Sequence, residues 1–185
     1  VTNEDSNNVS VINRYSGELA ATIPVGKKPR GIAVSPGKDG MKVYVANSGS
    51  DSISVIDATK LEVENEIPVR FGNGPEGLAA AGSVSQKALI FVTNFNSGSV
   101  SVIDALTYRE TEKIEVGNGP VAVAADPPVE GLFGSRSLSS EDISAIRSFR
   151  QRNFYVYVAN YHSHTISVLT VDNQTQTVKD AVQAA

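Results

Sequence analysis

The sequence YVANSGSDSISVID, from Tyr44 to Asp57, decides the fold, because its pattern recurs along the chain. In every copy, an Asn that closes an apolar stretch is followed seven residues later by a Ser. The four pairs are Asn3 and Ser10, Asn47 and Ser54, Asn94 and Ser101, and Asn160 and Ser167. Each Ser is preceded by Val or Ile and opens SVIN, SVID, SVID or SVLT. This alternation with a period of two indicates a β-strand.

A second marker, rich in Gly and Pro, separates the repeats. It reads VGKKP up to Pro29, GNGP up to Pro75 and VGNGP up to Pro120, which is the chemistry of turns. Each Pro is followed by a short apolar strand with small residues at fixed places, which indicates that one face is crowded. These small residues are Gly31 and Ala33, Gly77 and Ala79, and Ala122 and Ala124. A β-branched and aromatic run, the serine strand and an outer strand follow, so each unit has four strands.

Consecutive antiparallel four-stranded units suit the blades of a β-propeller, with the small-residue strand innermost. The sequence therefore predicts an all-β chain, a single propeller segment over residues 1–185 with about four repeat units. Their approximate bounds are 1–28, 29–74, 75–119 and 120–185. A flat sandwich is the alternative within all-β folds, but a sandwich has no reason to reuse one turn at one phase.

Three segments resemble the YVTN family of β-propeller repeats: YVAN at Tyr44–Asn47, FVTN at Phe91–Asn94 and YVAN at Tyr157–Asn160. The resemblance covers nearly the whole chain. It implies a propeller, commonly a seven-bladed one, in a periplasmic, secreted or cell-surface protein. It therefore implies an extracytoplasmic location, but not a single function.

The repeats do not complete a ring. The chain has four serine strands but only three small-residue inner strands, and closed propellers avoid bare blade faces. We expect this segment to be part of a larger ring, formed either by a longer polypeptide or by a second copy of the chain.

Composition excludes several function classes. The net charge of −4 argues against a nucleic-acid-binding surface. The absence of Cys excludes disulfides, thiolate zinc sites and a thiol nucleophile in this chain. No apolar run approaches the roughly 20 residues of a membrane-spanning helix, so no transmembrane segment is expected.

Positions that are alike in every repeat are expected to serve the fold. The repeated Asn would satisfy backbone groups of turns through its side-chain amide. Asp57 and Asp104 begin DATK and DALT, where an Asp bonds backbone amides two residues further on. No catalytic residue is predicted.

Positions that differ between repeats are free to serve function. The residues just after the turn prolines are Arg30, Glu76 and Val121, and they should lie at the mouth of the central channel. The loops between the second and third strands of each unit open on the same face, and the fourth carries Tyr161. Arg30, Glu76 and Tyr161 are the candidate ligand-binding residues, and the opposite charges of the first two make a general anion site unfavourable.

The fourth of these loops also holds both histidines of the chain. In an extended segment, residues two apart point the same way, so His162 and His164 could supply two imidazoles to one Cu or Zn ion. Further ligands would have to come from another blade. Solvated loop histidines are the alternative, and no cofactor is required by the sequence.

The last unit carries an insertion. From Pro120 to Asn160 there are 40 residues, against 18 and 19 in the two preceding units. The insertion spans approximately 131–152, and a Ser cap with apolar residues at a helical interval predicts a short helix over about 140–151. It either caps the blades beneath it or docks a partner through exposed residues. The candidate partner-binding residues are Phe133, Leu138, Arg147 and Arg150.

Together these features favour a non-enzymatic scaffold that binds a protein or a ligand. Its partner would be another protein or the remainder of its own propeller. The alternative is an accessory subunit or cofactor-binding propeller of a redox enzyme complex, resembling nitrite reductase or amine dehydrogenase propellers. The chain has no Trp, which excludes a tryptophan-derived quinone of its own.

Overall fold

The computed structural model describes residues 1–37, 39–81, 88–126, 154–172, 175 and 177–184. These residues form four antiparallel sheets that follow one another along the chain. The first sheet has three strands, β1 (Thr2–Asn3), β2 (Asn8–Ile12) and β3 (Leu19–Pro24). The second has β4 (Pro29–Gly37), β5 (Gly40–Asn47), β6 (Ser52–Asp57) and β7 (Glu62–Pro68).

The third sheet has β8 (Pro75–Ala81), β9 (Leu89–Asn94), β10 (Ser99–Asp104) and β11 (Arg109–Glu115). A short 3-10 helix, η1 (Phe95–Ser97), joins β9 to β10. The fourth sheet has β12 (Pro120–Ala125), β13 (Phe154–Asn160), β14 (Thr165–Val171) and β15 (Val178–Ala184). In every sheet each strand pairs with the next one along the chain, so each is a simple meander.

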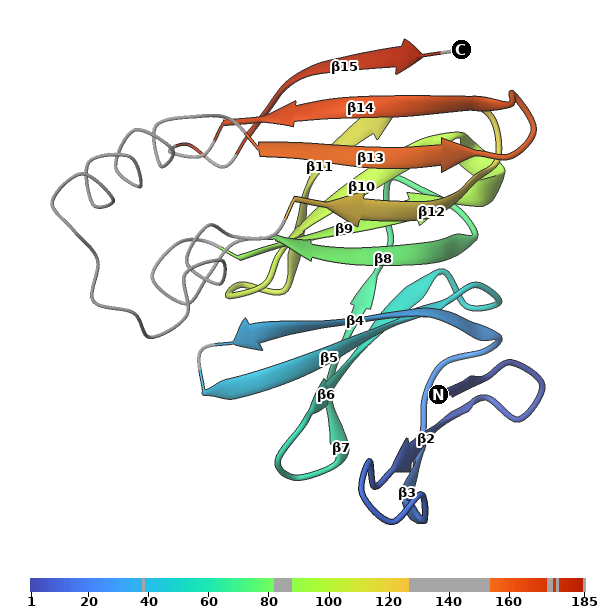
Figure 1. The fold of residues 1–185 in the computed structure, drawn as a ribbon, viewed down its shortest axis with the longest axis vertical. Coiled ribbons are helices and arrows are strands. Elements are labelled where there is room, and N and C mark those ends of the chain that lie inside the picture. Colours follow the sequence, from blue (N-terminus) through green and yellow to red (C-terminus); the bar gives the residue numbers. More distant parts are fainter. Residues whose placement is uncertain (38, 82–87, 127–153, 173–174, 176, 185) are drawn as a thin grey trace, which may run out of the picture.

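The predicted fold class is confirmed, because these meanders are stacked as the blades of a β-propeller. Figure 1 shows the sheets following one another along the long axis of the molecule, from β2 and β3 near the bottom to β12–β15 near the top. The predicted inner strands are β4, β8 and β12, which begin at Pro29, Pro75 and Pro120. β8 lies between the other two and contacts both.

The crowding inferred from the small residues comes from close approach of these inner strands. A Cβ atom on Gly31 would lie 2.1 Å from the carbonyl oxygen of Glu76 in the next blade. A Cβ atom on Gly77 would lie 2.8 Å from the carbonyl oxygen of Val121. Glycine therefore lets the backbones of successive inner strands meet near the axis.

Apolar clusters hold each sheet to the next. Between the second and third sheets, Tyr44 and Ile53 pack with Ile90 and Ile103. Between the third and fourth, Phe91 and Val100 pack with residues such as Val158 and Leu169. A smaller cluster joins Val9 and Ile23 of the first sheet to Val45 and Ile56 of the second. The apolar faces that the period-two pattern predicts are thus buried between blades.

The hydrogen-bond partner predicted for the repeated Asn was wrong. The side-chain amide of Asn94 donates to the hydroxyls of Ser99, at 3.3 Å, and Ser101, at 2.8 Å, rather than to turn backbone. Asn47 and Asn160 make the equivalent pairs of bonds with hydroxyls five and seven residues further on. Because Asn and Ser face one another on adjacent strands, the amide reaches a side chain before it reaches a turn. The invariant spacing is therefore a strand-to-strand clamp.

The interpretation of Asp57 and Asp104 is confirmed. Asp57 accepts hydrogen bonds from the N–H groups of Thr59, at 2.8 Å, and Lys60, at 2.9 Å. Asp104 accepts the equivalent bonds from Leu106, at 2.9 Å, and Thr107, at 3.1 Å. Both carboxylates hold the turn before the outer strand.

The predicted helix and its candidate partner-binding residues lie outside the described residues. These residues are Phe133, Leu138, Arg147 and Arg150. None of the helical structure in the described part of the chain has the length and apolar character needed to cross a membrane.

Candidate ligand-binding site

One backbone pattern positions the variable side chains at the mouth of the propeller. In each of the last three blades, the loop after the second strand bonds to the turn before the inner strand. The N–H of Phe95 donates to the carbonyl of Gly74, at 2.9 Å, and the N–H of Tyr161 donates to that of Gly119, at 2.8 Å. Ser48 donates in the same way to Lys28, at 3.0 Å. This pairing brings the residue after each repeated Asn beside the residue after each turn Pro.

The two sets of residues line a hollow of about 410 Å³. The residues after the turn prolines contribute Arg30, Glu76 and Val121, and those after the repeated asparagines contribute Ser48, Phe95 and Tyr161. Asn96, next to Phe95, completes the lining. The hollow therefore brings together the three predicted ligand-binding residues, Arg30, Glu76 and Tyr161, from three different blades.

Sequence reasoning missed Ser48, Phe95 and Asn96. A signal for the first two was present, because the position after the repeated Asn reads Glu4, Ser48, Phe95 and Tyr161 and differs in every repeat. The prediction drew on this position in the last repeat only.

The charged wall of the hollow is a linked group of three side chains. The Arg30 guanidinium donates to Glu4, at 3.0 Å, through one nitrogen and to Glu76 through another. The hydrogen bond to Glu4 raises the pKa of Arg30 most, and the charges of both carboxylates add to it. Arg30 thus stays protonated and its charge is shared by two carboxylates.

Another part of the lining is aromatic. The His162 ring lies 5.2 Å from the Phe95 ring and 5.2 Å from the Tyr161 ring, measured between centroids. It also covers Gly119, where a Cβ atom would come within 2.6 Å of the imidazole. Phe95 is half-buried and Tyr161 is exposed, so the wall offers ring surface to the solvent.

The extended geometry assumed for the two histidines was wrong, because residues 161–164 form a turn. His164 has a left-handed backbone with φ of 54°, and Asn7, Asp51 and Gly98 occupy the same place in the other repeats with φ of 55°, 47° and 60°. The described residues contain no group of three or more His, Asp or Glu placed to hold a metal ion. Binding of Cu or Zn by His162 and His164 stays a prediction.

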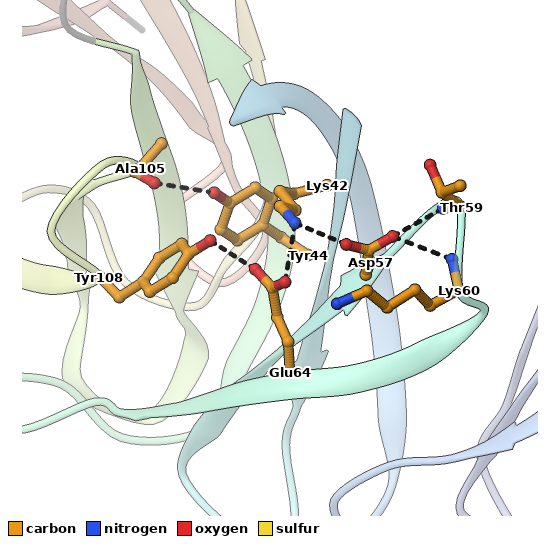
Figure 2. A network of polar contacts seen from close by, with 8 residues as sticks. All are labelled: Lys42, Tyr44, Asp57, Thr59, Lys60, Glu64, Ala105 and Tyr108. Atoms are coloured by element: carbon orange, nitrogen blue, oxygen red, sulfur yellow. Dashed lines mark hydrogen bonds and ion pairs between the residues drawn. The ribbon is translucent and has the colours of Figure 1, made fainter. Parts of the chain in front are cut away.

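A second polar cluster lies at the other end of β5, far from the hollow along that strand. Figure 2 shows Lys42 bonded to two carboxylates, Asp57 at 2.9 Å and Glu64 at 2.7 Å. The Tyr108 hydroxyl, from the next blade, donates to Glu64 at 2.6 Å, and that of Tyr44 donates to the carbonyl of Ala105 at 3.3 Å. The cluster therefore ties the second blade to the third.

Hydrogen bonds between charged groups, together with burial, shift the pKa values in this cluster. Hydrogen bonds to Glu64 and Asp57 raise the pKa of the Lys42 ammonium although its side chain is only 3% exposed. The bond from Lys42, with those from Lys60 and Thr59, holds the pKa of Asp57 well below its ordinary value. Burial would raise the pKa of Glu64, but hydrogen bonds from Lys42 and Tyr108 outweigh it and leave that pKa lowered. Burial and the bond to Glu64 raise the pKa of Tyr108 to about 12.

Comparison with known proteins gives matches among solved structures alone. No protein-family model matches the chain, and no curated protein matches it. Hydrazine synthase of Kuenenia stuttgartiensis is similar at 20% identity and a TM-score of 0.66, over 99% of this chain and 45% of that one. The dihydro-heme d1 dehydrogenase NirN is similar at 15% identity and a TM-score of 0.60, over 97% and 34%. BBS1N is similar at 12% identity and a TM-score of 0.63, over 98% and 51%.

At these identities the likeness concerns the fold, and it identifies the chain as β-propeller structure. The chain spans about half or less of the length of each of these proteins. The propeller fold is thus established. What the scaffold does has to be argued from the residues of the hollow.

Proposed function

We propose that this chain is a non-enzymatic binding scaffold, in which the repeated residues hold the blades together and the variable residues at the mouth bind a ligand or a protein. One observation carries the proposal. Of the seven described residues that line the hollow, six occupy two repeat positions whose identity changes from blade to blade. Residues that serve only a repeated fold would be repeated as well.

The chemistry of the lining also fits binding better than catalysis. The charged groups are already paired, since Arg30 is bonded to Glu4 and Glu76. The aromatic rings of the lining offer surface for contact. A few directed polar groups beside ring surface are typical of recognition sites.

The proposal includes an extracytoplasmic site of action, which rests on the resemblance of the repeats to the YVTN family. Fractionation of the source cells, followed by detection of the chain with a specific antibody, tests this part. Recovery in the cytoplasmic fraction would contradict it.

A fluorescent reporter tests the binding site directly. The chain has no Trp, so a Phe95→Trp variant carries its one indole at the hollow. A Tyr15→Trp variant is the matched control, because Tyr15 is 85% exposed and lies in the turn between β2 and β3. We expect a saturable change in the fluorescence of the Phe95→Trp variant on addition of a ligand that the wild-type chain binds in calorimetry. An equal response from both variants would contradict binding at the hollow.

A further inference from the structure

The charges around the hollow select against charged ligands. Among the described lining residues Arg30 is the one cation, and it is bonded to both Glu4 and Glu76. An anionic ligand would meet two carboxylates against one guanidinium, while a cationic ligand would have to compete with Arg30 for carboxylates that are already bonded to it. Both cost free energy, because like charges placed side by side are unfavourable and broken charged hydrogen bonds are expensive. The charge pattern therefore favours a neutral ligand.

The same residues place donors beside acceptors. Arg30 offers N–H groups next to the carboxylate of Glu76, and Ser48 also lines the hollow and has a hydroxyl group. The Asn96 amide nitrogen donates to Asn73 at 3.0 Å, which leaves the amide oxygen of Asn96 as an acceptor. A hydroxyl group both donates and accepts, so a ligand with several neighbouring hydroxyls matches this arrangement.

The aromatic rings add a requirement for apolar surface on the ligand. Phe95 and Tyr161 flank His162, with 5.2 Å between each pair of neighbouring ring centroids and interplanar angles of 55° and 62°, so the rings offer several tilted apolar surfaces rather than one flat one. Aromatic rings gain from contact with apolar C–H surface, and the Tyr hydroxyl remains able to bond a polar edge. The ligand thus has an apolar face and a polar rim.

We infer that the hollow binds a neutral saccharide, with a sugar ring packed against Tyr161 beside Phe95 and its hydroxyls bonded to Glu76, Arg30 and Asn96. This inference rests on the proposed function and specifies the class of ligand. The volume of about 410 Å³ fits, since it lies within the range of about 300–1,000 Å³ typical of small-molecule sites. The site is open at the mouth, so a sugar at the end of a longer glycan also fits.

Titration followed by amide NMR spectra tests the inference on the complete chain. The probes are three neutral trisaccharides (maltotriose, cellotriose and triacetylchitotriose), the anionic sugar sialyllactose and the cationic peptide trilysine. We expect at least one neutral trisaccharide to shift the amides of Phe95, Asn96 and Tyr161 in a saturable way. A Tyr161→Ala variant should bind it at least about tenfold more weakly, because the ring contact is lost.

Two further variants separate stacking from loss of structure. Tyr161→Phe retains the ring and should bind within about threefold of the wild type, a free-energy difference below 1 kcal/mol. Tyr15→Ala removes an exposed ring from the turn between β2 and β3 and should bind equally well. Shifts at the hollow caused only by sialyllactose or only by trilysine would overturn the inference of a neutral saccharide and leave the proposed site standing. Shifts confined to other parts of the chain would overturn both the inference and the proposed site, whereas no shift with any probe would overturn the saccharide inference alone.

Discussion

At the scale of single residues, the repeated Asn leaves no room for a side chain larger than that of glycine at one position of each turn. A Cβ atom on Gly72 would lie 2.2 Å from the side-chain amide of Asn94, and Gly26 and Gly117 meet Asn47 and Asn160 in the same way. The amide cannot move aside, because it is buried and holds two serine hydroxyls. The Gly in the turn and the Asn in the strand are therefore one structural unit, although they are far apart in sequence.

This unit makes a first prediction. Gly72→Ala should lower the free energy of unfolding by about 2–3 kcal/mol through overpacking. Gly17→Ala is the control, since Gly17 has φ of 73° but open space around it, and should cost about 1 kcal/mol. In an Asn94→Ala background the cost of Gly72→Ala should fall below about 1 kcal/mol. Chemical denaturation of the wild type and the four variants measures these values, and additive costs would contradict the clash.

A second residue-scale prediction concerns two Asn–Gly pairs in equivalent turns. The N–H of Gly74 donates to the carboxylate of Asp51 at 2.7 Å, whereas that of Gly119 makes no hydrogen bond within the described residues. Gly98 stands where Asp51 stands one repeat earlier, so the acceptor is missing. Deamidation requires the glycine nitrogen to lose its proton and attack the Asn side-chain carbon, releasing ammonia. We expect Asn118 to deamidate faster than Asn73.

Peptide mapping by mass spectrometry after incubation at neutral pH measures both rates. An Asp51→Gly variant reproduces the Gly98 arrangement and should bring the rate at Asn73 up to that at Asn118. Equal rates in the wild type, or no effect of Asp51→Gly, would show that the hydrogen bond to Gly74 offers no protection.

At the scale of strands and blades, Lys42 is the clearest departure from the repeat. Its equivalents are Leu89 in the third blade and Tyr155 in the fourth. Glu64 lies at a bulge of β7, where the third blade has Thr111. The Lys42–Glu64 ion pair thus takes the place of the uncharged side chains Leu89 and Thr111.

Removing Lys42 alone should be strongly destabilising, since a Lys42→Met variant leaves Asp57 and Glu64 close together without their cation. Lys60→Met, an exposed neighbour, is the control and should leave the denaturation midpoint nearly unchanged. The double variant Lys42→Leu/Glu64→Thr imports the residues of the third blade and should recover part of the loss. A midpoint no higher for the double variant than for Lys42→Leu would contradict this account.

The cluster also predicts a pH dependence. The lowered pKa values of Asp57 and Glu64 stabilise the fold above about pH 4, and this contribution is lost as the pH falls below their ordinary values. The raised pKa values of Lys42 and Tyr108 stabilise the fold below about pH 10, and this contribution is lost at higher pH. In Lys42→Met the unpaired carboxyls should bind protons more readily. The stability gap to the wild type should therefore narrow from pH 7 to pH 4, and a widening gap in denaturant titrations would contradict it.

The strands were predictable because Asn47, Ser54 and Pro75 mark a period that no single strand could reveal. The hollow was predictable in part, since Arg30, Glu76 and Tyr161 could be placed on one face from topology. The hydrogen-bond partners of the repeated Asn could not be predicted, because they depend on the register between strands. The Lys42 cluster could not be predicted either, because it includes Tyr108 from the next blade.

At the scale of the whole molecule, the terminal blades expose faces that internal blades bury. Ile53 is fully buried against the third sheet, whereas Ile166, its equivalent in the fourth sheet, is 51% exposed. Tyr157 is likewise 43% exposed, although its equivalents Tyr44 and Phe91 are buried. The exposed face of the fourth sheet thus has the residue pattern of a blade-to-blade interface.

This contrast gives a matched pair of variants. Ile53→Asp should cost more than about 4 kcal/mol, because it buries an unpaired charge. Ile166→Asp in the same 185-residue chain should cost less than about 1 kcal/mol, as an exposed position does. Thermal denaturation compares them, and similar losses would indicate that the face of the fourth sheet is covered in solution by another surface.

The central claim is that repeated residues build the scaffold while variable residues at the mouth bind, and two adjacent residues separate these roles. The most direct test is the free energy of unfolding of Asn94→Ala and Phe95→Ala. Asn94→Ala should lose about 1–3 kcal/mol, because the clamp between strands is broken. Phe95→Ala should lose less than about 1 kcal/mol, because its half-buried ring lines the hollow rather than the core. A Phe95→Ala variant as unstable as Asn94→Ala would contradict the account, since the ring would then be part of the scaffold.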